Sequence, residues 1–191
     1  LTESHSWLRE THLKTAEADG SNQKILVKAK ADQRKFPIYR ASPVAWSPDG
    51  ETIACAVQEM DENGAFYKIL LVNPGDGSEK YLSEKRWNNL ENIAWKNGEN
   101  LAVIDDDPGS PVRHIWEISR ATGAARQLTD DLNSYQWLSS SSANGILLTV
   151  QKKDFSSLFV ADYGENTKTL RSKQILSEPG VIENIHWSLD G

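Results

Sequence analysis

The sequence predicts an all-β protein made of repeated four-stranded antiparallel sheets. Three observations support this: tryptophans recur at nearly even spacing, a glycine turn follows each of them, and short β-rich runs fill the intervals. The recurring residues are Trp46, Trp95, Trp137 and Trp187, at intervals of 49, 42 and 50 residues. A period of about 40 to 50 residues with four strands per period is typical of β-propeller blades.

Each recurring tryptophan closes a short first strand and precedes a turn. The strands lie at residues 44–47, 93–96, 135–138 and 185–188. The clearest turn contains Asp49 and Gly50, because Pro-Asp-Gly supplies the fixed φ and the left-handed position that a tight reversal requires. The other turns reach Gly98, Gly145 and Gly191. Each tryptophan is therefore expected to begin a hairpin.

Three more strands are expected after each turn. The second strands are apolar on both faces and too short for a helix, which is typical of strands buried on two sides. They lie at 52–57, 100–104 and 145–150. The third strands lie at 67–72, 114–118 and 157–161, and the fourth, more polar strands lie at 79–82, 125–128 and 173–176.

These strands give one β-propeller region over residues 1–191, with repeat units at approximately 1–50, 51–98, 99–145 and 146–191. With the strands of a blade lettered a to d, the chain begins with b-c-d and ends with an extra strand a. The fold is thus a propeller fragment of about four blades in permuted register. A helix over 7–18 is the alternative for the first segment, but its two leucines lie five residues apart and form no apolar stripe, so strands are preferred.

The permuted register leaves open how the fragment closes. The last strand, at 184–187, can pair with the N-terminal blade of the same chain. Alternatively, open blade edges can pair between chains and form a homo-oligomer, because an unpaired edge invites strand addition.

Composition excludes several kinds of partner. The formal net charge is −6, and no run of Lys and Arg has the density of a phosphate-tracking patch, so nucleic acid is not expected to bind. The longest aliphatic run, at 69–72, is far too short to span a membrane. The chain begins at Leu1 without a leader, which suggests a processed or excised piece.

The sequence lacks the motifs of common catalytic and metal-binding sites. No G-x-S-x-G elbow occurs, and His5, His12, His114 and His186 are scattered without the spacing of a metal site. No glycine-rich loop is placed to hold a phosphate. We therefore expect no catalytic residues, no bound metal and no cofactor.

Two further features receive structural interpretations. The acidic cluster at 105–107 is interpreted as a solvated turn rather than a calcium site, since consecutive carboxylates rarely converge on one ion. Cys55 lies in an apolar strand and is interpreted as buried filler.

The aromatic side chains suggest both packing and binding roles. The four repeat tryptophans and Trp116 are expected to pack between blades. Trp87 follows Arg86 in a polar loop, and this pair of residue types is enriched at binding hot spots, although packing of Trp87 onto the blade is favoured. His186 is a candidate for a ligand contact in the central channel, although a hydrogen-bonded histidine within the strand is favoured.

The segment from Ala45 to Gly50, followed by Thr52-Ile53-Ala54, resembles the repeat of TolB-like, PD40-type (WD40-like) β-propellers. Ala18-Asp19-Gly20 and the run at 126–129 are similar to other elements of that repeat. Residues 41–137 resemble propeller regions attached to bacterial serine/threonine kinases and winged-helix regulators. The later turns depart from the pattern, most clearly where 139–144 replaces the third turn, so a shared binding site is not implied.

The resemblance implies a non-catalytic binding module, the sensor or partner-binding part of a larger signalling protein, whose protein or small-molecule ligand is unknown. It implies a periplasmic or extracytoplasmic location, with a cytoplasmic one as the alternative. One rival is the propeller gate of a prolyl-oligopeptidase-like serine peptidase, which needs a hydrolase domain outside these residues. Another rival is an enzyme with its chemistry in the channel.

Overall fold

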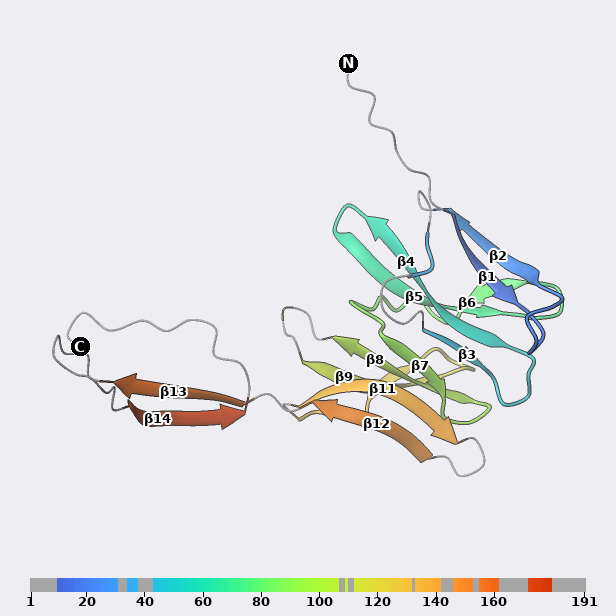
Figure 1. Cartoon of the computed structure of the whole chain (residues 1–191). Coiled ribbons are helices and arrows are strands. Elements are labelled where there is room, and N and C mark those ends of the chain that lie inside the picture. Colours follow the sequence, from blue (N-terminus) through green and yellow to red (C-terminus); the bar gives the residue numbers. More distant parts are fainter. Residues whose placement is uncertain are drawn as a thin grey trace, which may run out of the picture.

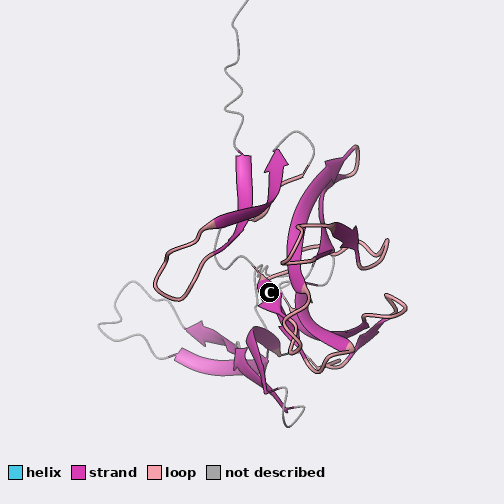
Figure 2. Cartoon of the chain, turned by 90° about the vertical axis from the view of Figure 1, so that its right-hand side faces the viewer, coloured by secondary structure: helices cyan, strands magenta, loops and turns pink. Residues whose placement is uncertain are grey.

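The computed structural model describes residues 10–30, 34–37, 43–106, 109, 112–131, 133–141, 146–152, 155–161 and 172–179, and these contain strands but no helix. The strands are β1 (Glu10–Thr15), β2 (Lys24–Lys30), β3 (Val44–Trp46), β4 (Ile53–Asp61), β5 (Gly64–Val72), β6 (Glu79–Tyr81), β7 (Asn92–Trp95), β8 (Asn100–Asp106), β9 (Arg113–Ser119), β10 (Ala125–Gln127), β11 (Ser134–Ser141), β12 (Ile146–Lys152), β13 (Phe155–Ala161) and β14 (Ser172–Pro179). Figure 1 shows them as antiparallel sheets, and Figure 2 gives the perpendicular view.

Two complete four-stranded blades form the centre of the molecule. One has the order β3-β4-β5-β6 and the other β7-β8-β9-β10, with all neighbours antiparallel. Each blade is a meander of strands that follow one another in the chain, as the sequence predicts for 44–82 and 93–128. The all-β propeller architecture is therefore confirmed.

The central strands of the β3–β6 blade contribute to two cores because side chains alternate between the faces of a strand. On one face, Ala54 and Leu71 belong to the core shared with the β7–β10 blade. On the other face, Cys55 and Leu70 belong to the core shared with the β1–β2 hairpin. Burial on both faces explains why these strands are continuously apolar.

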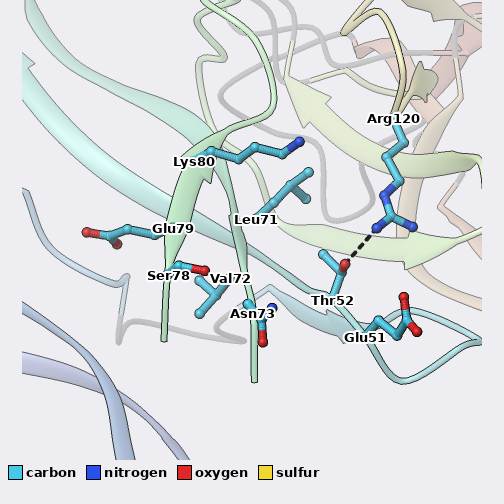
Figure 3. Close-up of a pocket in the computed structure, with 9 residues that line it drawn as sticks. All are labelled: Glu51, Thr52, Leu71, Val72, Asn73, Ser78, Glu79, Lys80 and Arg120. Atoms are coloured by element: carbon cyan, nitrogen blue, oxygen red, sulfur yellow. Dashed lines mark hydrogen bonds between the residues drawn. The ribbon is translucent and has the colours of Figure 1, made fainter. Parts of the chain in front are cut away.

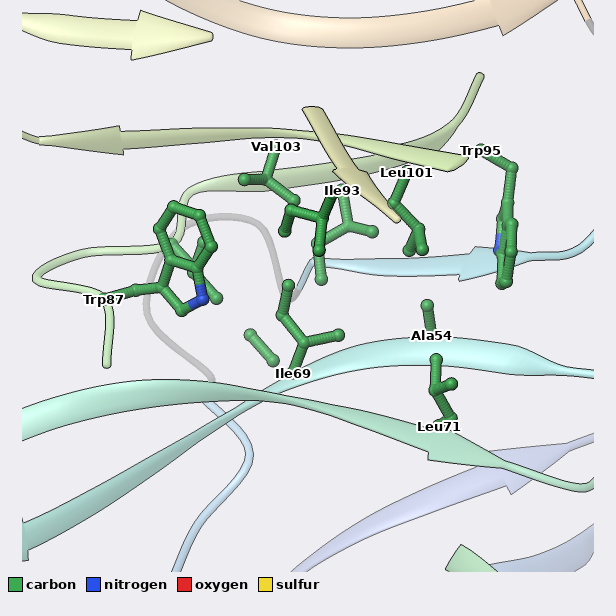
Figure 4. Close-up of a cluster of buried hydrophobic side chains, with 11 residues drawn as sticks. Ala54, Ile69, Leu71, Trp87, Ile93, Trp95, Leu101 and Val103 are labelled. Carbon is green, nitrogen blue, oxygen red and sulfur yellow. The ribbon is translucent and has the colours of Figure 1, made fainter. Parts of the chain in front are cut away.

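The core between the two complete blades is the largest cluster of buried apolar side chains in the described structure, and Figure 4 shows it. Trp95, only 3% exposed, lies at one end of this cluster. Its indole Nε1 donates to the carbonyl of Ala45 at 3.0 Å, and its own carbonyl accepts from the Ser140 hydroxyl. Trp95 therefore links the first strands of neighbouring units, β3, β7 and β11.

The other repeat tryptophans do not share this environment, which corrects the expectation that all of them pack between blades. Trp46 is 52% exposed because the described part of the first unit offers no inner strand beside β3. Trp137 is 60% exposed and has a φ of 61° at a β-bulge, so Leu138 takes the buried position instead. Trp187 lies outside the described residues.

The end units are incomplete in the described structure. β1 and β2 form a two-stranded hairpin over residues 10–30, so strands replace the alternative helix there. The strands at 135–138, 145–150, 157–161 and 173–176 were expected to form one four-stranded sheet. They pair instead as two separate hairpins, β11–β12 and β13–β14, and no hydrogen-bonded ladder joins β12 to β13. In Figure 1 the β13–β14 hairpin stands apart from the other sheets.

A buried carboxylate ties three strands of the β7–β10 blade together. Glu117 on β9 lies 2.5 Å from Lys96 Nζ, after β7, and also accepts from Arg126 on β10. Hydrogen bonds from Lys96 and then Arg126 lower the pKa of Glu117 below its ordinary value, against the opposing effect of burial.

This shift gives the stability of the protein an acid-sensitive component. A lowered folded-state pKa adds stability that is present above the unfolded pKa of Glu117 and is lost as the pH falls through the folded value. We expect Glu117→Gln to be destabilising at about pH 6, with the difference from the wild type shrinking by about pH 3. Urea denaturation at several pH values measures this. Glu62→Gln, at the exposed β4–β5 turn, is the control, and a difference that stayed constant with pH would contradict the assignment.

The tryptophan environments give a second prediction. Trp95→Ala is expected to lower the free energy of unfolding by about 3–5 kcal/mol, the range for deletion of a core aromatic. Trp46→Ala is expected to cost less than about 1 kcal/mol because half of the ring is in solvent. Chemical denaturation monitored by circular dichroism distinguishes the two, and equal costs would show that the repeat tryptophans are equivalent after all.

Candidate functional site

A polar hollow lies where the two complete blades meet. Its volume is about 630 Å³. The β3–β6 blade supplies most of its wall, and the turn after β9 supplies Arg120 (Figure 3). The lining residues are Glu51, Thr52, Leu71, Val72, Asn73, Ser78, Glu79, Lys80 and Arg120. We call this space the junction hollow.

Arg120 reaches across the blade boundary. Its Nη2 donates to the hydroxyl of Thr52 at 2.8 Å, and its Nη1 lies 3.5 Å from a carboxylate oxygen of Asp49. Its guanidinium carbon is 5.5 Å from the centre of the Trp95 ring. A guanidinium can donate and stack at the same time, so Arg120 fastens the β9–β10 turn to the neighbouring blade.

The turn that Arg120 meets is the Pro-Asp-Gly turn singled out in the sequence. Gly50 has a φ of 74°, and its N–H donates to the carbonyl of Ser47 at 2.9 Å. The Asp49 carboxylate accepts from the hydroxyl of Ser47 and from the N–H of Glu51. These hydrogen bonds, with that of Ser47 first, hold the pKa of Asp49 below its ordinary value. Asp49 therefore presents a charged, fixed carboxylate to Arg120.

Two side chains in the wall of the hollow carry hydrogen-bond donors that have no acceptor in the described chain. Lys80 on β6 is exposed and forms no hydrogen bond or ion pair with the described residues. The Asn73 side chain accepts from the N–H of Gly75 at 2.8 Å through Oδ1, while its Nδ2 meets no acceptor in the described chain. In Figure 3 the Lys80 side chain points toward Leu71 and Arg120.

The two glutamates of the wall, Glu51 and Glu79, differ in whether a cationic side chain binds them. Arg34 Nη2 donates to both carboxylate oxygens of Glu79, at 2.5 and 2.6 Å, and Figure 3 shows the Glu79 side chain pointing away from Arg120. Glu51 is exposed beside the hollow and has no such cationic partner among the described residues. The charges that face the hollow are therefore Lys80, Arg120 and Glu51.

Arg86 and Trp87, the predicted recognition pair, do not line the junction hollow, and of the two only Arg86 is exposed to solvent. Trp87 is buried in the core between the blades, where its ring packs edge-to-face on Trp116 at 5.7 Å between centroids. The Lys85 ammonium lies over both rings, at 4.5 and 4.8 Å from their centres. A recognition role for Trp87 is therefore wrong, and the packing alternative holds.

Arg86 is half exposed and is tied to the tip of the β4–β5 hairpin. Its Nη1 lies 2.5 Å from a carboxylate oxygen of Asp61, and its guanidinium stacks on Phe66 at 4.1 Å. Arg86 therefore has an ion pair and a ring contact within the chain, and its role in partner binding stays a prediction. His186, the channel candidate, lies outside the described residues, and its role stays a prediction.

The acidic cluster is not a solvated turn, which corrects that interpretation for its first two members. Asp105 is buried and accepts from the N–H groups of Asn88 and Asn89, at 3.3 and 2.7 Å. Burial nevertheless raises the pKa of Asp105 above its ordinary value. Asp106 binds Arg113 at 2.9 Å. These carboxylates fix the loop between β6 and β7. Asp107 lies outside the described residues.

Other reactive groups carry no site in the described chain. Within the described ranges, no three His, Cys, Asp or Glu side chains gather in a way that can hold a metal ion. Cys55 is fully buried, and burial raises the pKa of its thiol to about 12. Of the residues described, none belongs to a helix with the length and apolar character needed to cross a membrane.

Sequence reasoning missed the junction hollow because its members come from segments that are far apart in the chain. Lys80 lies in the fourth strand of its blade and Arg120 lies in a turn. Polar residues are ordinary at such positions, so neither residue indicates a binding site. The one available signal was the equivalence of the repeat units, which places the turn after the third strand of one unit beside the first turn of the preceding unit.

Comparison with known proteins agrees with the architecture. No family model and no curated protein matches the sequence. Among solved structures, TolB from Acinetobacter baumannii matches at 15% identity and a TM-score of 0.50, over 85% of this chain and 34% of that one. A TolB-type protein from Agrobacterium tumefaciens matches at 12% identity and 0.46, over 88% and 55%. The β-propeller domain of the Trilobed protease from Pyrococcus furiosus matches at 11% and 0.40, over 73% and 56%.

These likenesses concern the fold alone. The chain spans about a third of the length of the Acinetobacter protein. Together with the two complete blades, the match to that protein shows that the chain has the fold of a TolB-like β-propeller.

The geometry of the blade junction gives a third prediction. Arg120→Gln and Thr52→Val each remove the hydrogen bond between the blades, so a double-mutant cycle is expected to show a coupling energy of about 1 kcal/mol. Urea denaturation of the four proteins measures it. A matched cycle with Arg120→Gln and Thr15→Val, on the separate β1–β2 hairpin, is expected to be additive. Additivity in both cycles would contradict a direct contact.

Proposed function

We propose that this chain is a non-catalytic β-propeller module that binds a polypeptide partner at the junction hollow, as the partner-binding part of a larger signalling protein. The observation that carries the proposal is the hollow itself, with donors on Lys80 and Asn73 that have no acceptor in the described chain. Volumes of several hundred Å³ with a few placed polar groups are typical of binding sites.

The packing of the two blades supports a role as a rigid platform. Leu71, a member of the core between the blades, forms part of the wall of the hollow, and Arg120 is held by Thr52 and lies against the Trp95 ring. A wall fixed by packing and hydrogen bonds loses little conformational entropy when a ligand binds. The signalling context is supported only by the resemblance of residues 41–137 to propellers attached to kinases and winged-helix regulators.

The proposal is tested by selecting partners and then closing the hollow. A library of displayed random peptides is selected on the intact chain, and the affinities of enriched peptides are measured by calorimetry. Ser78→Trp places a large ring in the hollow, so we expect it to weaken binding by about tenfold or more. Mass spectrometry of the recovered peptides is expected to show them unchanged.

A matched control comes from the equivalent turn of the N-terminal hairpin. The N–H of Ser21 donates to Asp19, just as the N–H of Ser78 donates to Asp76. Ser21→Trp therefore adds the same side chain to the same kind of turn and is expected to leave affinity unchanged. Failure to enrich any peptide, equal effects of the two substitutions, or cleavage of the peptides would each overturn the proposal.

A further inference from the structure

The donors that line the junction hollow indicate the chemistry of its ligand. They come from three separate segments: Lys80 from β6 and Asn73 from just after β5, which have no acceptor in the described chain, and Arg120 from the turn after β9, which already donates to Thr52. All three carry N–H groups, and hydrogen bonds from such donors are strongest when the acceptor is an oxygen anion.

The balance of charge in the wall limits the charge of that anion. Arg120 is partly neutralised by Asp49 at 3.5 Å, and Glu51 stands beside the hollow without a cationic partner among the described residues. Glu79 is engaged by Arg34 and points away from Arg120. Among the described residues of the wall, Lys80 is therefore the cation without a carboxylate partner. A ligand with one negative charge would be repelled less by the nearby carboxylates of Asp49 and Glu51 than a doubly charged phosphate would.

The apolar part of the wall adds a second requirement. Leu71 belongs to the core between the blades and also lines the hollow, and Figure 3 shows the Lys80 side chain extending beside it. A ligand with a short aliphatic stem below its charged group can cover this surface while its oxygens reach the donors. Inorganic anions have no such stem.

We infer that the junction hollow is a carboxylate-binding site, which takes a single carboxylate of a polypeptide between Lys80, Asn73 and Arg120. This inference rests on the proposed function, of which it names the ligand chemistry. The carboxylate is either an acidic side chain or a C-terminal group, and both present the same pair of oxygens to the site.

The test uses small probes, so that it does not depend on any selected peptide. The isotope-labelled chain is titrated at constant ionic strength with N-acetyl-glutamate α-methylamide, which carries a side-chain carboxylate. It is titrated in parallel with N-acetyl-alanine, which carries a terminal carboxylate, with neutral N-acetyl-glutamine α-methylamide, and with inorganic phosphate. Chemical shifts are followed at the amides of Thr52, Asn73 and Lys80 and at the Nε–H of Arg120.

We expect saturable shifts at these groups with one or both carboxylate probes, and the tighter probe identifies the source of the carboxylate. Binding by the neutral amide is expected to be at least about tenfold weaker, the effect of losing one charge-assisted hydrogen bond. Lys80→Gln is expected to weaken carboxylate binding about five- to tenfold and Lys80→Arg to restore it. Lys28→Gln, an exposed lysine on β2, is expected to have no effect.

The outcomes separate this inference from the proposed function. Equal binding of the neutral and charged probes, tighter binding of phosphate, or an unchanged affinity in Lys80→Gln would overturn the carboxylate site. If the carboxylate site were overturned in this way while Ser78→Trp still weakened peptide binding, the proposed function as a polypeptide-binding module would stand. Carboxylate binding without any enriched peptide would support the site and overturn the polypeptide-binding function.

Discussion

The structure depends on one constraint: a blade must bury both faces of its central strands at once. Side chains in β4 and β5 alternate between the two neighbouring sheets, so Ala54 and Leu71 pack toward one blade while Cys55 and Leu70 pack toward the β1–β2 hairpin. No single sheet of this kind is stable alone, because half of its apolar surface would stay in water. Each blade therefore fixes the position of the next, and Trp95 fixes the row of first strands by its hydrogen bond to Ala45.

This packing leaves polar groups where neighbouring blades diverge, and the junction hollow arises there. Leu71 and Trp95 lie at one end of the core (Figure 4), and beside them the side chain of Arg120 joins the two sheets. The same side chain thus stabilises the boundary between the blades and lines the hollow. A site of this kind needs no irregular loop, since its shape follows from the angle between two sheets and its chemistry from a few turn and edge residues.

The sequence predicts local elements well because turns and two-sided burial leave local signals. Pro-Asp-Gly at Gly50 and the apolar run of β4 identify a hairpin and a buried strand without knowledge of the rest of the chain. The environments of the tryptophans could not be predicted, since burial of Trp46 depends on a neighbour from a different unit, and a single bulge turned Trp137 toward solvent. The burial of Trp87 could not be predicted for the same reason. Its sequence neighbours are polar, but its ring packs on Trp116 from another blade.

The junction hollow could not be predicted from the sequence, because its residues come from two neighbouring repeat units. The Pro-Asp-Gly turn meets a need of the local backbone, whereas the groups that face the junction hollow come from two neighbouring units. Arg120 has no counterpart of the same chemistry at the corresponding turn of the β3–β6 blade, where the matching hydrogen bonds place Pro74 at its position. Equivalent turns thus keep the same backbone while carrying different side chains. Each boundary between blades can therefore acquire its own binding chemistry without disturbing the alternating cores that hold the sheets together.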